Sequence, residues 1–292
     1  MKKNDNILTI LFQCVNVVFL CLFCIVMIYP FIYVISASIS EPHYIEAGEV
    51  LLTPKGLNLQ SYRDIIRDKF VWRGYSNTIL YSFGSAFIGV LITYFTAYPL
   101  SKKTFTFSNF FTFLVTFTMF FSGGMVPKYL VINAMGMVDT IWAIILPTAC
   151  HAWYVLLVRN YLKSLPESLE ESALIDGANE FVILFRIIIP LSLPILATIT
   201  LFYIVKEWNS VMPPLIYLSD YKKFPLQVVL YRLVILSETS DLTETSLDQI
   251  RQRTLVTVKY AVIVAATLPL LVIYPFIQRY FVKGIMVGAI KG

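Results

Sequence analysis

The chain has 292 residues, of which 58% are hydrophobic and 14% are charged, and its net charge is +5. This composition excludes a water-soluble surface and predicts a membrane protein. The basic residues are dispersed around the apolar stretches and form no basic-aromatic module, so nucleic acid is not an expected partner.

Six long stretches of the chain contain no charged residue, and a helix needs about 20 apolar residues to cross a bilayer. They predict an all-α membrane protein with six transmembrane helices, because a transmembrane barrel would show short alternating segments instead. The predicted spans lie in one transmembrane domain of residues 1–292, at about 10–36, 77–100, 107–127, 139–159, 189–212 and 257–281.

The first span is expected to remain in the mature protein. Lys2 and Lys3 precede it as in a secretory signal, but the uncharged run extends to Ser40 without an obvious short apolar region and cleavage site. The four cysteines lie within predicted spans, so neither disulfides nor a metal site is expected; they are Cys14, Cys21, Cys24 and Cys150.

Because the predicted number of spans is even, both termini are expected on one side of the membrane. The compact basic clusters of the predicted inner loops favour cytoplasmic termini, although the two long outer loops, at about 41–75 and 219–256, also carry many basic residues. Small residues recur along the second span at three- and four-residue spacing, which predicts close helix packing; they are Ser82, Ser85, Ala86, Gly89 and Thr93.

The longest inner loop, residues 163–190, predicts a helix-turn-helix elbow. Pro166 and Glu167 suit a first helical turn, and Gly177 suits the end of that helix. After the turn, an apolar face that can pack on the bundle is formed by Phe181, Leu184, Phe185 and Ile188, and Pro190 opens span five.

This loop resembles the EAA loop of ABC importer permeases, except that Ser172 replaces the usual second alanine. The resemblance implies the type I permease fold, a cytoplasmic loop, and docking of its first helix on an ATPase; the alternative is an interfacial helix that only anchors a loop. The coupling residues that it implies are Glu170, Glu171, Ser172, Ala173, Asp176, Gly177, Ala178, Ile187 and Pro190.

Two further stretches point to sugar import. Residues 120–147 look like the subgroup that imports complex oligo- and polysaccharides, and residues 278–292 look like the tail of maltose-type permeases. In that family the tail reaches between the ATPase subunits, which gives a role to Gly284, Gly288 and Gly292; a frayed terminus is the alternative.

The resemblance implies that the chain works with a second homologous permease subunit, a cytoplasmic ATPase dimer, an extracellular solute-binding protein and a sugar, in the cytoplasmic membrane. The sequence has no G-x-x-x-x-G-K-[ST] motif, so ATP and Mg²⁺ are expected in the partner ATPase and this chain is not expected to be an enzyme.

Polar residues near the end of span five indicate a substrate pathway, because they precede the helix-breaking Pro213 and Pro214. The candidates are Tyr203, Lys206, Glu207, Trp208 and Asn209, where the aromatic rings would stack on sugars. An interfacial anchor with a snorkelling lysine explains the same residues. His151 in span four is expected to be a packed or hydrogen-bonded helix residue.

Two other functions compete with import as interpretations of the sequence. An ion-coupled secondary transporter would use Lys206 and Glu207, but the six spans show no repeat and the elbow suits an ATPase. A membrane-embedded enzyme would have little to build a site from, since His43 and His151 are far apart in sequence and the spans hold no clustered carboxylates.

Overall fold

The computed structural model describes residues 7–239, 257–269, 271, 272 and 274. Helices are the regular secondary structure of this part of the chain, together with one isolated β-bridge between Ser40 and Leu57, which confirms the all-α prediction. The chain divides into two compact units: residues 1–69 with 230–268, and residues 70–229 with 269–292.

The first unit begins with α1 (Ile7–Ser38), which is followed by α2 (Pro42–Glu46) and α3 (Gln60–Arg67). The most apolar stretch of α1 has none of its residues buried inside this chain. A helix that is apolar all round is covered by lipid or by another protein. The end of α1 is tied to the following loop and to α3, since Ser36 donates to the Leu52 carbonyl at 2.8 Å and Ser38 hydrogen-bonds Tyr62 of α3 at 2.8 Å.

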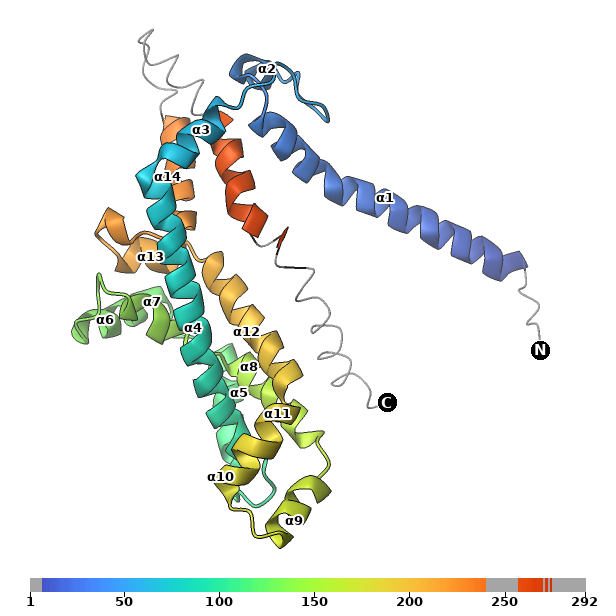
Figure 1. Cartoon of the computed structure of the whole chain (residues 1–292), viewed down its shortest axis with the longest axis vertical. Coiled ribbons are helices and arrows are strands. Elements are labelled where there is room, and N and C mark those ends of the chain that lie inside the picture. The colour runs from blue at the N-terminus through green and yellow to red at the C-terminus, as the bar shows by residue number, and fades with distance from the viewer. Residues whose placement is uncertain (1–6, 240–256, 270, 273, 275–292) are drawn as a thin grey trace. The chain divides into compact units, whose positions relative to one another are not determined.

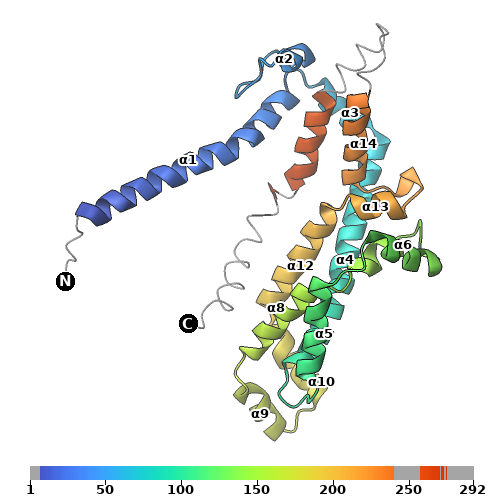
Figure 2. The ribbon, with the colours of Figure 1, turned by 180° about the vertical axis from the view of Figure 1, so that it is seen from behind.

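The second unit is organised around the long helix α4 (Lys69–Ser101). In both views, α5, α8 and α12 run beside the half of α4 that leads to Ser101, and α9 lies beyond that end (Figure 1, Figure 2). The other helices and turns of this unit are α5 (Ser108–Phe120), α6 (Met125–Ala134), α7 (Trp142–Ile145), a 3₁₀ turn (Leu146–Thr148), α8 (Ala152–Lys163), α9 (Ser168–Ile175), α10 (Glu180–Ile183), a π-helical turn (Leu184–Ile188), α11 (Ile189–Leu191), α12 (Leu193–Trp208), α13 (Met212–Tyr217) and a 3₁₀ turn (Tyr221–Lys223). The helix α14 (Leu226–Thr239) begins in this unit, and its residues from Leu230 onward belong to the first unit.

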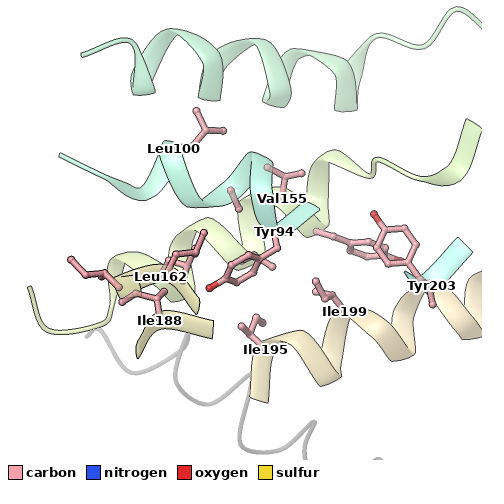
Figure 3. Packing of buried hydrophobic residues seen from close by; sticks show 14 of the residues in the cluster. Tyr94, Leu100, Val155, Leu162, Ile188, Ile195, Ile199 and Tyr203 are labelled. Atoms are coloured by element: carbon pink, nitrogen blue, oxygen red, sulfur yellow. The ribbon is translucent and has the colours of Figure 1, made fainter. Parts of the chain in front are cut away.

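The main core of this unit joins α4, α8, the elbow and α12 (Figure 3). Its buried side chains include Tyr94, Leu100, Val155, Leu162, Ile188, Ile195, Ile199 and Tyr203. The small-residue stripe of α4 confirms its prediction of close packing: a Cβ on Gly89 would lie 2.6 Å from the Tyr203 ring, and Thr93 hydrogen-bonds the Tyr203 hydroxyl at 2.8 Å.

Two of the predicted spans, 107–127 and 139–159, are bent where continuous helices were expected, and a third bend lies at Ser192, near the start of the predicted span 189–212. The bends measure 113° between α5 and α6, 47° between the α7 segment and α8, and 73° between the α10–α11 segment and α12. The first bend follows Gly123 and includes Gly124 with a φ of +82°, a conformation that interrupts a helix. By length and composition, α1 and α4 alone are long enough to cross a membrane, and the described residues give five crossings if each bent pair is one span.

The sixth predicted span, 257–281, coincides in part with the apolar helix Thr257–Pro269. The rest of that span lies largely outside the described residues, as do Gly284, Gly288 and Gly292.

Candidate coupling site and membrane pathway

The elbow begins with α9, which ends in a Schellman turn at Gly177. The Ala178 amide donates to the Ala173 carbonyl at 2.9 Å, and the Gly177 amide donates to the Leu174 carbonyl at 3.0 Å. Gly177 has a φ of +80°, and a Cβ built on it would meet no atom within 4 Å. Glycine is therefore favoured here by backbone conformation and not by lack of space.

The second arm of the elbow begins at Asn179, whose side chain accepts a hydrogen bond from the Val182 amide at 2.9 Å. This is an N-cap that the sequence analysis did not single out. The five-residue π-helical turn that follows widens the helix and turns its face.

The predicted packing face of this arm is therefore only half correct. Leu184 and Ile188 are buried as expected, and Ile183 joins them. Phe181 and Phe185, by contrast, are 73% and 54% exposed. The α-helical spacing used for the prediction does not hold through a π-helical turn, because its hydrogen bonds enclose one extra residue.

Two ion pairs connect α9 to the turn between α4 and α5. Lys102 pairs with Glu170, and Lys103 pairs with Glu167 at 2.7 Å. The side chains of the first pair are 19% and 30% exposed, whereas those of the second are 80% and 61% exposed. The inner pair is thus the better shielded from water, so it contributes more to holding α9 in place.

The environment of Lys102 stabilises its charged form. Burial alone lowers the pKa of this ammonium, but hydrogen bonds to Glu170 and Tyr98 outweigh that effect and raise the pKa above its ordinary value. The ammonium also lies 4.5 Å from the centroid of the Tyr98 ring, and the Tyr98 hydroxyl donates to Glu180 at 3.4 Å. Both arms of the elbow therefore contact the same end of α4.

Backbone carbonyls at the same end of the unit hold the other helices. Arg159 on α8 donates through Nε to the Leu100 carbonyl at 2.9 Å, and Ser108 on α5 donates to the same carbonyl at 2.7 Å. Tyr161 donates to the Leu191 carbonyl at 2.8 Å. The Leu100 carbonyl at the end of α4 thus links α4 to both α5 and α8.

The coupling residues implied by the sequence separate into two groups in the structure. Ala173 is buried, Glu170 pairs with Lys102, and Ala178 and Ile187 are half-buried; the exposed group is Glu171, Ser172, Asp176, Gly177 and Pro190. The far end of α9 is also apolar, because Leu174 is 52% and Ile175 is 87% exposed. The elbow therefore presents an apolar tip beside two exposed acids.

The residues suggested for a substrate pathway are mostly interior. Tyr203 is 1% exposed, and its hydroxyl donates to the Ala149 carbonyl at 3.3 Å and accepts from the His151 amide at 3.3 Å. Glu207 and Trp208 are each 5% exposed. Lys206 and Asn209 are exposed, and the Asn209 amide donates to the Val205 carbonyl at 2.8 Å.

Two expectations about the ends of these helices need correction. Pro213 and Pro214 do not break a helix but lie in the first turn of α13, while the chain leaves helical geometry before it, after Asn209. His151 is not inside a helix but directly precedes α8, with its ring stacked on Tyr154 at a centroid distance of 4.5 Å.

Asp139 forms a second polar centre away from the elbow, beside the half of α4 that begins at Lys69. Its carboxylate accepts from Lys223 Nζ at 2.6 Å and from the amides of Ser219 and Asp220 at 3.0 and 3.1 Å. The hydrogen bond from Lys223, followed by those from the two amides, lowers the pKa of Asp139 to about 2. The residue has a φ of +60° and precedes α7, so it lies in a turn where the predicted span 139–159 begins.

The loop that Asp139 holds is also tied to α4. Asn77 Nδ2 donates to the carbonyls of Lys222 and Phe224 at 2.9 and 3.0 Å, and Tyr81 donates to the Lys223 carbonyl at 2.8 Å. Among the described residues, no group of three or more His, Cys, Asp or Glu side chains is arranged to hold a metal ion.

Comparison with known proteins identifies the family to which this chain is similar. A family model described as the inner membrane component of binding-protein-dependent transport systems matches residues 1–287. Polygalacturonan/rhamnogalacturonan transport system permease protein YtcP of Bacillus subtilis (strain 168) is 39% identical over 276 residues, which cover 94% of this chain and 96% of that protein. Protein LplC of the same organism is 38% identical over 283 residues, with 96% and 95% covered.

A solved structure is also similar to this chain, in both sequence and fold. It is the crystal structure of a bacterial ABC transporter involved in the import of the acidic polysaccharide alginate, one chain of which matches with a TM-score of 0.84 and 34% identity. The match covers 96% of this chain and 99% of that chain. The chain therefore belongs to the family of inner membrane components of binding-protein-dependent transport systems and is a membrane permease subunit.

Proposed function

We propose that this chain is one permease half of an ATP-driven importer that moves an oligosaccharide or polysaccharide across the cytoplasmic membrane. Its two termini and the elbow are cytoplasmic, and ATP with Mg²⁺ is held and hydrolysed by a partner ATPase. The support is the family match over residues 1–287 together with a relative named for polygalacturonan and rhamnogalacturonan transport. The other partners are a second homologous permease and an extracellular solute-binding protein.

The proposed mechanism depends on the geometry of α9. This helix is anchored at its beginning by Glu167 and Glu170 and ends at Gly177, where Leu174 and Ile175 are exposed. An apolar helix end with neighbouring acids suits a groove on another protein, since its burial there removes apolar surface from water. The proposed occupant of the tip is thus a groove on the ATPase.

Movement of the ATPase subunits would then reach the bundle through the anchored elbow. Coupling requires that the docked helix make different contacts in the two states of the transporter, because a ligand or partner shifts an equilibrium only by its differential affinity. The ion pairs with Lys102 and Lys103, and the core contacts of Leu184 and Ile188, provide a stiff connection to α4 and α12. The bundle would respond as a rigid body.

Ile175→Asp tests this function. Placing a carboxylate at the apolar tip is expected to reduce ATP-driven saccharide uptake and co-purification of the ATPase by about tenfold or more, since a buried unpaired charge is costly. Leu57→Asp is the matched control, because Leu57 is 78% exposed in the predicted outer loop. Uptake is measured in proteoliposomes that contain the complete transporter.

Normal uptake and normal ATPase recovery with Ile175→Asp would remove the docking role from α9. Saccharide transport by this chain alone, without any ATPase, would instead support a secondary transporter and overturn the proposal as a whole.

A further inference from the structure

The exposed side of α8 changes from apolar to basic along its length. At three- and four-residue spacing, this side of the helix carries Trp153, Leu156, Asn160 and Lys163. Trp153 is 52% exposed and Leu156 is half-buried, whereas Asn160 and Lys163 are exposed. Arg159 lies beside Lys163, four residues earlier on the helix. We call this surface the outer face of α8.

Two hydrogen bonds fix the basic end of α8 to its neighbours. Arg159 Nε donates to the Leu100 carbonyl at 2.9 Å, and the Tyr161 hydroxyl donates to the Leu191 carbonyl at 2.8 Å. The other side of the helix is buried in the main core, where Figure 3 shows Val155. The outer face is therefore held in one orientation, so a ligand would find its cations already in place.

Arg159 and Lys163 have no acidic partner in the part of the chain that the structure describes. Neither takes part in any of the ion pairs found there, and the guanidinium of Arg159 hydrogen-bonds there through Nε alone. The next acid along the chain, Glu167, pairs instead with Lys103 at 2.7 Å. Like charges at this helical spacing repel each other, so an anion that contacts both would be favoured.

The length of the outer face matches one leaflet of a bilayer. From Trp153 to Lys163 the helix rises about 15 Å, at ~1.5 Å per residue. The hydrocarbon core of a membrane is about 30 Å thick, so each leaflet contributes about 15 Å. The predicted span 139–159 ends at Arg159, which places Lys163 at the level of the lipid headgroups. Trp153 then lies at the depth of the acyl chains.

We propose that the outer face of α8 binds one anionic phospholipid. Its phosphate contacts Arg159 and Lys163, its glycerol region lies beside Asn160, and an acyl chain packs on Trp153. Basic residues at the end of a membrane-spanning helix attract anionic headgroups in this way. The inference goes beyond the proposed function, because it requires only that the chain lies in a membrane. The lipid would stabilise the end of α8 at its depth, where the chain continues into the elbow.

The second permease subunit is the other partner that would cover this face. A protein would have to supply a carboxylate for the two cations and an apolar surface for Trp153. An anionic phospholipid supplies both within one molecule, and it does so over the same length as the face. The two occupants differ in whether an acyl chain reaches Trp153, and this difference gives the test.

The experiment uses the complete transporter in proteoliposomes and measures quenching of Trp153 fluorescence by lipids with brominated acyl chains. Brominated phosphatidylglycerol and brominated phosphatidylcholine are compared in phosphatidylcholine membranes, which gives the relative affinity for the anionic lipid. The Trp153 signal is the difference between otherwise identical transporters with and without Trp153→Phe. The variants are Lys163→Gln, Arg159→Gln and Lys163→Arg, with Lys222→Gln as the control at an exposed lysine of the same unit.

The unmodified transporter is expected to prefer phosphatidylglycerol at Trp153. Lys163→Gln and Arg159→Gln should each lower this preference about fivefold, the change expected for one basic residue near an anionic headgroup. Lys163→Arg keeps the cation and should retain most of the preference, and Lys222→Gln should leave it unchanged. Quenching by brominated phosphatidylcholine should be the same in all variants, because the acyl contact with Trp153 remains.

Quenching of Trp153 by neither lipid would show that protein covers the face and would overturn the inference. Equal quenching by both lipids in the unmodified transporter would also overturn it, since the contact would then be unselective. The same holds for an unchanged preference in either Gln variant, or for Lys163→Arg as weak as Lys163→Gln. An equal loss in Lys222→Gln would assign the effect to total charge, and altered phosphatidylcholine quenching in the Gln variants would assign it to a change in structure; either result would overturn the inference.

Discussion

Gly177 carries the sharpest functional prediction at the scale of single residues. A side chain at a φ of +80° costs about 1–2 kcal/mol, and more when it is β-branched. Gly177→Val is therefore expected to leave the chain in the membrane while ATP hydrolysis no longer produces uptake, because the Schellman turn that directs α9 would be strained. Uptake and hydrolysis are measured together in proteoliposomes.

Gly136→Val provides the matched control for this variant. Gly136 has a φ of +67° and equally open surroundings, but it follows α6 and lies outside the elbow. The same backbone strain there should lower stability without separating hydrolysis from uptake. Gly177→Asn should be milder than Gly177→Val, since asparagine tolerates this conformation better. Full coupling in Gly177→Val would show that the turn is not needed.

Asp139 allows a prediction about pH. Its folded-state pKa is lowered to about 2 from an ordinary 3.8, so its contribution to stability is fully present above about 4 and is lost as the pH falls through about 2. Asp139→Asn should therefore lower Tm by about 2 °C, a value in keeping with an exposed pair. That difference should stay constant between about pH 5 and pH 8.

Thermal unfolding of the purified protein at several pH values checks this expectation. In the double variant with Lys223→Gln, the second change should add little to the first, because both remove the same interaction. A Tm difference that shrinks between pH 7 and pH 5 would contradict the assigned pKa.

At the scale of elements, the inner ion pair of α9 is expected to matter more than the outer one. Lys102→Glu places two carboxylates together in a partly buried setting and should reduce coupled uptake severalfold, while the double reversal with Glu170→Lys should restore much of it. Lys103→Glu makes the same charge change at the exposed pair with Glu167 and should have a smaller effect. Comparable losses in the two single variants would contradict this ranking.

The elements also show where reading the sequence succeeds. Uncharged stretches identified α1 and α4, because hydropathy depends only on local composition. The bend after α5 was not foreseen, because the length of an apolar run carries no information about direction. The signal available was local: Gly123 and Gly124 interrupt the run, and Gly124 adopts a positive φ.

The sequence predicts the helix-turn-helix outline of the elbow, but it does not predict which residues the elbow contacts. Gly177 was identified as the end of α9 because a helix stop has a local signature. The pairing of Lys102 with Glu170 joins residues 68 positions apart, and periodicity cannot report such a contact. The π-helical turn likewise has no simple residue pattern, so the exposure of Phe181 and Phe185 was not expected.

At the scale of the whole molecule, the family could be identified from the inner loop alone, while the role of the pathway residues required coordinates. Tyr203 was considered for sugar stacking because an aromatic ring at membrane depth is often functional. In the structure the ring lies against Gly89, which is far from Tyr203 in sequence, so local patterns could not reveal the contact.

The Tyr203 hydroxyl has a consequence for how this permease can change shape. It bonds Thr93 on α4, the Ala149 carbonyl and the His151 amide, so one oxygen atom fastens three segments at a single level. Relative sliding of α4, α8 and α12 at that level would break all three bonds and separate the ring from Gly89. Hinges of the transport cycle should therefore be sought away from it, at the bend between α11 and α12 and in the segment from Asn209 to Val211.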